Sequence, residues 1–279
     1  MSERYALVTG ASTGIGHASA VALAAAGFHV FAGVRKEADA ERIRSESIEP
    51  LILDVCDRGQ IAAAVETVRE RVGETGLHGL VNNAGIAVAG PLEFLPLEDF
   101  ERQMNINVTG LVAVTQAFIP LLRQARGRIA MISSTNGFFA APFMAPYAAS
   151  KFAVEAIGDC LRVELSTWGI KVAIIEPGAI KTEIWDKATA DNEAILARMD
   201  PQVHELYPKP IEAMRREGKA AESRAVDPKA VTDCVLHAMT ATRPKTRYLC
   251  GGGARPQWIL ARWVPDRVRD AVLRKVMGA

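Results

Sequence analysis

Ser134, Tyr147 and Lys151 follow one another near the middle of the chain, and these residue types together could move a proton to or from an oxygen. Tyr147 and Lys151 are four residues apart at the start of a predicted helix, so their side chains share one face. A free phenol, with a pKa of about 10, is a poor base near neutrality. A nearby ammonium favours the phenolate, and the Ser134 hydroxyl could hold a substrate oxygen while charge shifts onto it. The set suits the interconversion of an alcohol and a carbonyl.

The position of Ser134 is what gives this pair of side chains weight. A tyrosine four residues before a lysine occurs in many helices and by itself indicates ordinary packing. Ser134, however, follows a strand predicted at Ile129–Ile132. In a parallel sheet, the carboxyl ends of the strands share one edge with the starts of the following helices, and ligands bind there. Ser134 and Tyr147 can therefore face one pocket. Ser133 is the neighbouring alternative for the hydroxyl.

The elements that must position these residues alternate along the chain. Short apolar runs predict strands at Tyr5–Val8, His29–Val34, Leu51–Val55, Leu80–Val81, Ile129–Ile132 and Val172–Ile175. Helical patterns lie between or after them, at Gly14–Ala26, Gln60–Arg71, Glu98–Arg123, Tyr147–Thr167 and Asp227–Thr240. This alternation indicates a parallel sheet covered on both faces. We expect an α/β fold, a Rossmann-like doubly wound parallel sheet with helices on both faces, in a single domain over residues 1–279.

A glycine-rich turn follows the first predicted strand. Gly10 lets the chain turn sharply, Gly14 lets the backbone approach a pyrophosphate without a Cβ in the way, and Gly16 lets the helix pack close to the sheet. The helix then presents its first N–H groups and the positive end of its dipole to the phosphates. Glycine turns are common, but this one follows a strand and opens a helix, as a dinucleotide site requires. The residues predicted to bind the cofactor here are Gly10, Ser12, Thr13, Gly14, Ile15 and Gly16.

The end of the second strand indicates which dinucleotide is bound. An acidic residue there favours the free 2′-hydroxyl of NAD, whereas an arginine accommodates the 2′-phosphate of NADP. The chain has Val34 at this point, followed by Arg35 and Lys36. A guanidinium can hold a phosphate through two hydrogen bonds, and the Thr13 hydroxyl could add another. The alternative is that Arg35 is a solvated loop charge. We expect NADP rather than NAD.

The spacing G-x-x-x-G-x-G in TGASTGIG, residues 9–16, resembles that of the classical short-chain dehydrogenase/reductase (SDR) family. The sequence Asn82-Asn83-Ala84-Gly85 is similar to the family's fourth-strand signature. The resemblance implies that Asn83, Ala84 and Gly85 pass close to the cofactor. It also implies that Asp54, with Val55 beside it at the end of the third strand, contacts the adenine. A helix N-cap is the alternative for Asp54, because Asp54 and Asp57 both precede a predicted helix.

The same resemblance implies a role for each residue of the catalytic set. Tyr147 would be the acid and base, Lys151 would also bind the nicotinamide ribose, and Ser134 would orient the substrate. Asn107, an unusual residue in the middle of a predicted helix, would help to place a proton-relay water. The segment bordering the nicotinamide would contain Pro177, Gly178, Ile180 and Thr182.

Aromatic residues between Ser134 and Tyr147 indicate a lipophilic substrate, with Phe139 and Phe143 as its candidate contacts. Packing of the core is the alternative for them. The local sequence around Tyr147 resembles the subgroup of 17β-hydroxysteroid and retinol dehydrogenases. Two other functions are a 3-oxoacyl-thioester reductase, which would need a basic docking patch for an acyl carrier, and a non-catalytic NADP-binding sensor. A sensor need not keep the serine, tyrosine and lysine together.

Composition excludes several other classes. The net charge of +1 gives no case for nucleic acid as a partner, and four scattered cysteines predict neither a metal site nor disulfides. The charged N-terminus is unlike a signal peptide, so we expect a cytoplasmic protein. Family membership implies a homodimer or homotetramer. The polar stretch Glu183–Ala225 is predicted to be a substrate loop or lid. The amphipathic tail, residues 255–279, is expected to dock on this or a neighbouring subunit, with peripheral membrane contact as the alternative.

Overall fold

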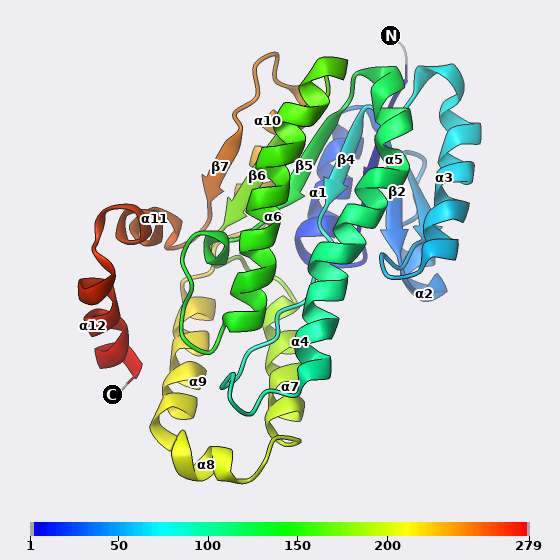
Figure 1. Ribbon diagram of the computed structural model, residues 1–279. Coiled ribbons are helices and arrows are strands. Elements are labelled where there is room, and N and C mark those ends of the chain that lie inside the picture. The colour runs from blue at the N-terminus through cyan, green and yellow to red at the C-terminus, as the bar shows by residue number, and fades with distance from the viewer. Residues whose placement is uncertain (1–2, 278–279) are drawn as a thin grey trace.

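Seven parallel strands form a single sheet in the computed structural model, which describes residues 3–277 (Figure 1). The strands are β1 (Arg4–Val8), β2 (Phe28–Val34), β3 (Ile48–Ile52), β4 (Gly79–Asn82), β5 (Arg128–Ile132), β6 (Lys171–Pro177) and β7 (Arg247–Cys250). Their order across the sheet is β3-β2-β1-β4-β5-β6-β7. The chain moves outward from β1 to β3 and then returns to β4 beside β1. This reversal creates a crevice at the carboxyl ends of β1 and β4, where ligands of such sheets bind.

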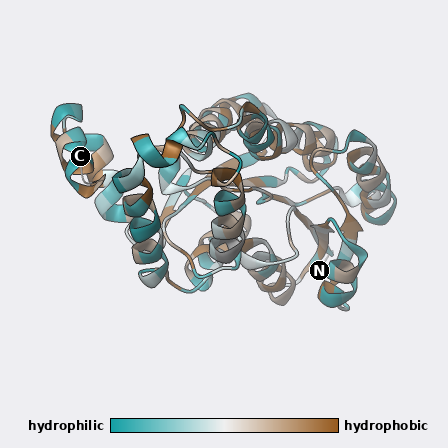
Figure 2. Cartoon of the chain, turned by 90° about the horizontal axis from the view of Figure 1, so that it is seen from below, coloured by the Kyte–Doolittle hydropathy of each residue, from teal (hydrophilic) through white to brown (hydrophobic). Residues whose placement is uncertain are grey.

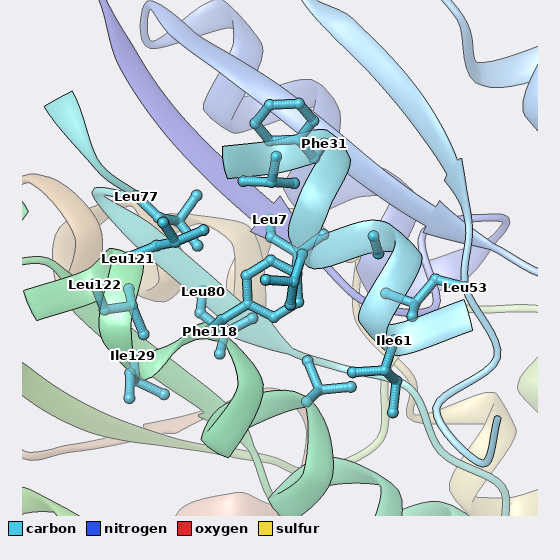
Figure 3. Close-up of a cluster of buried hydrophobic side chains, with 14 of the residues drawn as sticks. Leu7, Phe31, Leu53, Ile61, Leu77, Leu80, Phe118, Leu121, Leu122 and Ile129 are labelled. Carbon is cyan, nitrogen blue, oxygen red and sulfur yellow. The ribbon is translucent and has the colours of Figure 1, made fainter. Parts of the chain in front are cut away.

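Helices cover both faces of the sheet, which confirms the predicted doubly wound fold. One face carries α1 (Gly14–Ala25), α2 (Glu37–Ile43) and α10 (Lys229–Thr240), and the other carries α3 (Arg58–Val72), α5 (Leu111–Ala125) and α6 (Ala145–Glu164). The strands are apolar along their length because both of their faces are buried. Figure 3 shows the core between the sheet and the second layer, where Leu7, Leu80 and Phe118 meet from β1, β4 and α5.

The third strand lies at Ile48–Ile52, three residues before the predicted Leu51–Val55. The predicted range begins just after Pro50, but Pro50 lies inside the strand and pairs with Ala32. β3 is an edge strand, and an edge position tolerates a residue without a backbone N–H. Asp54 consequently lies two residues beyond the strand, in the turn that leads to α3.

The predicted helix Glu98–Arg123 is a chain of three elements. α4 (Leu97–Met104) continues through a π-helical turn, η2 (Asn105–Gly110), into α5. The span Leu97–Ala125 is long and apolar enough to cross a membrane by length and composition alone, but half of its most apolar window is buried in the protein. Phe118 is fully buried between α5 and the sheet. The span therefore has the character of a core helix.

The stretch Glu183–Ala225, expected to be a weakly patterned loop, is mostly helical. It contains α7 (Ile184–Leu196), α8 (Gln202–Leu206) and α9 (Pro208–Ser223), which extend beyond the carboxyl edge of the sheet (Figure 1). These helices share a separate apolar cluster with the segment after β4, in which Met199, Val203 and Ile211 pack against Val88. The insertion is thus anchored over the sheet edge where the glycine turn lies.

The chain ends in two short helices, α11 (Ala254–Trp263) and α12 (Asp266–Met277), which we call the C-terminal arm. Figure 2 shows the arm at one side of the body, next to the other helices. The arm contacts the body through both helices: α11 packs against β7, and α12 packs against α9, where the Arg216 guanidinium donates to the carbonyl of Val276 at 2.6 Å. The opposite side remains open, since the side chain of Trp263 is 73% exposed and Trp258 is also exposed.

Candidate active site

The glycine turn between β1 and α1 leaves room for a phosphate. Gly10 and Gly14 have positive φ angles of 62° and 59°, which favour glycine. A Cβ on Gly16 would lie 2.2 Å from the carbonyl oxygen of Gly10 and 2.4 Å from Nδ2 of Asn83. α1 therefore packs so close to the turn that only glycine fits there. Its first turn contains no acidic residue, so its N–H groups and dipole can face an anion.

Asn83 and Thr9 fasten this turn to the next strand. The Asn83 amide donates to the carbonyl oxygens of Thr9, at 3.0 Å, and Gly10, at 3.1 Å. The Thr9 hydroxyl accepts from the backbone N–H groups of Asn83 and Ala84 at 2.9 and 3.1 Å. Sequence reasoning missed Thr9, whose position directly after β1 was the available signal. Asn83 lies beside the predicted phosphate site, and its hydrogen bonds fix the backbone of the glycine turn.

The segment after β6 reaches the same place. Pro177 ends β6, and the backbone N–H of Gly178 donates to Cys250 of β7. Ile180 is buried, and Thr182 lies over the glycine turn, since a Cβ on Gly14 would stand 3.2 Å from its Cβ. The predicted phosphate and nicotinamide segments therefore face each other across the crevice. A dinucleotide fits this arrangement, because glycines line the approach and helix α1 points into it.

Arg35 and Lys36 are the cations predicted to meet a 2′-phosphate. Arg35 and Lys36 follow β2 and are exposed. A third cation, Arg42 of α2, was missed by sequence reasoning: its Nη2 donates to the carbonyl oxygen of Ser12 at 2.8 Å and to Asp39 at 2.8 Å. Arg42 therefore stands against the glycine turn, next to Thr13. Arg42 reaches this turn because α2 folds back toward the end of β1.

Asp54 is not the N-cap of the next helix. Asp57 has that role, accepting from the N–H groups of Gly59 at 2.8 Å and Gln60 at 3.1 Å. The Asp54 carboxylate instead accepts from the N–H of Cys56 at 2.9 Å and is half-buried. Val55 is buried against Gly110, where a Cβ would lie 2.7 Å from its Cγ2.

Ser134, Tyr147 and Lys151 meet at the carboxyl edge of β5. Ser134 follows β5 and is buried, and its hydroxyl forms a hydrogen bond with the Tyr147 phenol. Tyr147 and Lys151 lie in the first turns of α6, with the ammonium 5.7 Å from the centroid of the phenol ring. Lys151 is only 6% exposed, and its Nζ donates to the carbonyl oxygen of Ile132 at 2.8 Å. The neighbouring Ser133 lies on the side of Glu155, since a Cβ on Gly137 would be close to both its hydroxyl and the Glu155 carboxyl group.

Burial controls the titration of this set. It raises the pKa of Tyr147, and the hydrogen bond with Ser134 offsets only part of that rise. The expectation that Lys151 depresses the pKa of Tyr147 is therefore not met by the protein alone. Burial lowers the pKa of Lys151 to about 8, although the charge of Glu155 acts in the opposite direction. The protein thus holds a neutral phenol beside a lysine that titrates close to neutrality.

Asn107 lies in the π-helical turn η2 and is 1% exposed. Its side chain accepts from the N–H of Ile86 at 2.9 Å, and donates to the carbonyl oxygen of Ile86 at 3.0 Å and to the Ser150 hydroxyl at 3.1 Å. A Cβ on Gly85 would lie 3.2 Å from its Oδ1. The side chain therefore ties the segment after β4 to α6. Gln103 assists it by donating to the same Ile86 carbonyl at 2.9 Å.

Three aromatic rings meet at Tyr207, one of them from Phe143, four residues before Tyr147. Phe143 has a positive φ of 65° and its ring meets that of Tyr207 edge-on, with centroids 6.1 Å apart. Phe94 meets the same tyrosine at 5.9 Å. Phe139, the other predicted contact, is half-buried in the loop after β5. Tyr207 and Phe94 were missed because they come from the α8–α9 junction and the segment after β4, far from Phe143 in the sequence.

A family model described as short chain dehydrogenase matches residues 4–193. The chain belongs to the short-chain dehydrogenase family. Retinol dehydrogenase 5 of Mus musculus is 36% identical over 99% of this chain and 89% of its own length. The NADPH-dependent 3-dehydrocapnine reductase of Ornithobacterium rhinotracheale is 37% identical over 98% and 96%. A crystal structure of a short-chain dehydrogenase from Burkholderia cenocepacia in complex with NADP matches with a TM-score of 0.72 and 26% identity, covering 97% of each chain.

These relationships confirm the resemblance inferred from the glycine turn and the tyrosine motif. This short-chain dehydrogenase is an oxidoreductase that binds a nicotinamide cofactor and interconverts alcohols and carbonyls. The similarity to a retinol dehydrogenase along almost the whole chain also confirms the expected subgroup.

Proposed function

We propose that this short-chain dehydrogenase uses NADP to interconvert the alcohol and carbonyl forms of a lipophilic small molecule, with Tyr147 as the proton-transferring residue. The observation that carries the assignment of roles is the meeting of Ser134, Tyr147 and Lys151 at the sheet edge that also holds the glycine turn. A phenol, a hydroxyl and an ammonium there can serve one substrate oxygen.

Each residue has a separate part in carbonyl reduction. The cofactor, when bound, supplies the hydride that the substrate carbon receives. The Ser134 hydroxyl donates a hydrogen bond to the carbonyl oxygen as negative charge develops there. Tyr147 transfers its phenolic proton to that oxygen, and Lys151 stabilises the resulting phenolate. Alcohol oxidation runs through the same steps in reverse, with Tyr147 accepting the proton.

The choice of NADP is supported by three cations at the adenosine end. Arg35 and Lys36 are exposed directly after β2, and Arg42 is held against the Ser12 carbonyl. The carboxylate that would select NAD is absent from the end of β2, where Val34 stands. A relative named as NADPH-dependent and a structural neighbour bound to NADP point the same way.

A lipophilic substrate is supported by the aromatic rings of Phe94, Phe143 and Tyr207, since Phe143 lies four residues before Tyr147. The similarity to an enzyme named for retinol favours the same substrate class. A 3-oxoacyl-thioester reductase and a non-catalytic sensor are the competing functions, and both are outcomes of the assay below.

We further propose that the enzyme is a homo-oligomer that pairs through α6. Phe152 and Val163 of this helix are exposed apolar side chains, and Leu97 at the start of α4 is exposed as well. Sedimentation velocity should show a dimer or tetramer, and Val163→Glu should dissociate it. A monomer at micromolar concentration would contradict this proposal.

The assay follows nicotinamide absorbance while steroid, retinoid, aliphatic and acyl-thioester carbonyls are offered with NADPH and NADH in parallel. Tyr147→Phe should lower kcat by at least about 10²-fold. Tyr5→Phe, near the amino end of β1 and away from the carboxyl ends of the strands, should leave kcat unchanged. Turnover of the acyl thioester alone would favour the thioester reductase. NADPH binding without turnover of any carbonyl would favour the sensor.

The NADP assignment has its own test in binding titrations. Arg35→Ala and Arg42→Ala should each weaken NADPH binding by roughly 10-fold, because each removes a charge-assisted hydrogen bond. NADH binding should hardly change, and Arg44→Ala, at the end of the same helix, provides the matched control. Equal losses for NADPH and NADH would mean that Arg42 only supports the turn.

A further inference from the structure

Beneath the catalytic lysine, α6, β6 and β7 bring three carboxyl groups around one guanidinium. Arg247, at the start of β7, places its Nε 3.1 Å from Oε2 of Glu155 and 3.5 Å from Oε1 of Glu176. Its Nη2 lies 2.8 Å from Oδ2 of Asp159. One cation therefore faces three acids, and the cluster carries excess negative charge if all three are ionised.

The three acids differ in their access to water. The side chain of Glu155 is 12% exposed and that of Glu176 is 5% exposed, whereas Asp159 is 44% exposed. Burial and the neighbouring acids raise the pKa of Glu176 to about 7. Glu155 also has a raised pKa through burial, but the hydrogen bond and the charge of Arg247 oppose that rise. Glu176 is thus the member that takes up a proton near neutrality, and Glu155 is the buried member equipped to be an anion.

Glu155 stands one helical turn after Lys151 on α6, so the two side chains share a face. Ile132, whose carbonyl oxygen accepts from the Lys151 ammonium, directly precedes Ser133, which lies on the side of Glu155. Among the described residues, Glu155 is the acid whose charge raises the pKa of Lys151 against the effect of burial. It belongs to none of the sites derived above.

The other charged groups around this part of α6 are accounted for. Tyr147 and Asp159 lie on α6 itself, Glu176 comes from β6, and Arg247 and Cys250 come from β7. On the side of α4, Asp99 is paired with Arg102 and Arg198. The 3-10 helices η3 (Thr135–Gly137) and η4 (Leu165–Trp168), which also pack on α6, contain no acidic or basic residue.

We propose that Glu155 is a positioning residue for the reaction: its carboxylate, held by Arg247, keeps the buried Lys151 ammonium charged beside Tyr147. This inference rests on the proposed roles of Tyr147 and Lys151. Glu155 touches neither substrate nor cofactor in it and acts through the lysine.

Removing the Glu155 carboxylate should shift the pKa values of Lys151 and Tyr147 in the same direction, so the order in which they lose their protons does not matter. The ammonium of Lys151 loses a stabilising partner, so its pKa falls. The phenolate of Tyr147 loses a repelling neighbour, so its pKa falls as well. For charges on successive turns of one helix, the change amounts to about one pH unit.

The test is the pH profile of NADPH-dependent reduction in Glu155→Gln, an isosteric change. The alkaline limb of kcat should move to lower pH by about one unit. Asp159→Asn is the matched control, because Asp159 contacts the same arginine but is exposed and lies a further turn away; its profile should move by less than about 0.3 unit. Glu155→Asp, which keeps the charge, should restore most of the shift.

Two further measurements keep the outcome decisive. Alkaline titration of phenolate absorbance, with the matching Tyr147→Phe proteins subtracted, should show the same downward shift without any substrate. Arg247→Gln, which removes the cation that favours ionised Glu155, should produce a smaller shift in the same direction if Glu155→Gln does not fold. Unshifted profiles, or equal shifts in Asp159→Asn, overturn the inference. Undiminished turnover in Tyr147→Phe would instead refute the proposed function itself.

Discussion

Replacing Asn107 with alanine should destabilise the protein by about 2–6 kcal/mol. The change removes three hydrogen bonds, to the N–H and carbonyl of Ile86 and to the Ser150 hydroxyl. Two of these groups keep a partner, since Gln103 still donates to the Ile86 carbonyl and Ser150 still donates to the carbonyl of Tyr147 at 2.7 Å. The Ile86 N–H loses the acceptor it has in the native structure, which costs about 1–3 kcal/mol, and each other lost bond costs about 0.5–1.5 kcal/mol.

The loss should also be felt by the cofactor, because Ile86 follows the Asn83-Ala84-Gly85 segment beside the glycine turn. Urea unfolding followed by tryptophan fluorescence gives the free energy of unfolding, and a fluorescence titration gives the affinity for NADPH. Asn105→Ala is the matched control, since Asn105 is an exposed asparagine in the same π-helical turn. A loss below about 1 kcal/mol in Asn107→Ala would refute the reasoning, because it would mean that the three bonds contribute almost nothing.

Three other changes follow from the geometry. Gly16→Ala should abolish NADPH binding, because its Cβ would lie 2.2 Å from the Gly10 carbonyl oxygen; a normal titration would contradict the tight packing of α1. Burial lowers the pKa of Lys151 from 10.5 to about 8. The unfolded chain therefore binds more protons than the folded protein between pH 8 and 10.5, and stability should rise with pH by up to about 3 kcal/mol. Lys151→Met should remove this rise in urea titrations at several pH values. Phe118→Ala, at a fully buried position, should cost about 3–5 kcal/mol of unfolding free energy in the same assay.

The sheet could be predicted from the sequence because its strands are short, apolar and buried on both faces. The third strand was misplaced next to Pro50. A proline indicates the boundary of a strand unless that strand is known to lie at an edge of the sheet, and the order of the strands depends on the whole fold. Pro201 and Pro208 lie in the stretch Glu183–Ala225, which was predicted to be a loop. They stand at the starts of α8 and α9, where a missing N–H costs nothing, so they open helices instead of interrupting a loop.

The candidate site could be predicted only where its residues follow a local motif. Ser134, Tyr147 and Lys151 are separated by fixed spacings along one strand and one helix, so the sequence predicts that they meet. Arg42 reaches Ser12 across 30 residues, and Arg247 reaches Glu155 across 92. Contacts of this range depend on how α2 folds back and on where β7 joins the sheet, which no local pattern indicates.

The C-terminal arm separates the charge of the molecule into two poles. Residues 254–279 contain six arginine and lysine residues and two aspartates, a net charge of +4, whereas the whole chain has a net charge of +1. The remaining residues, 1–253, therefore carry a net charge of −3. A protein truncated before α11 should be retained more strongly than the intact chain on an anion-exchange column, and less strongly on a cation-exchange column. The intact protein, although almost neutral in sum, is an electric dipole whose positive end is a pair of helices that pack against β7 and α9.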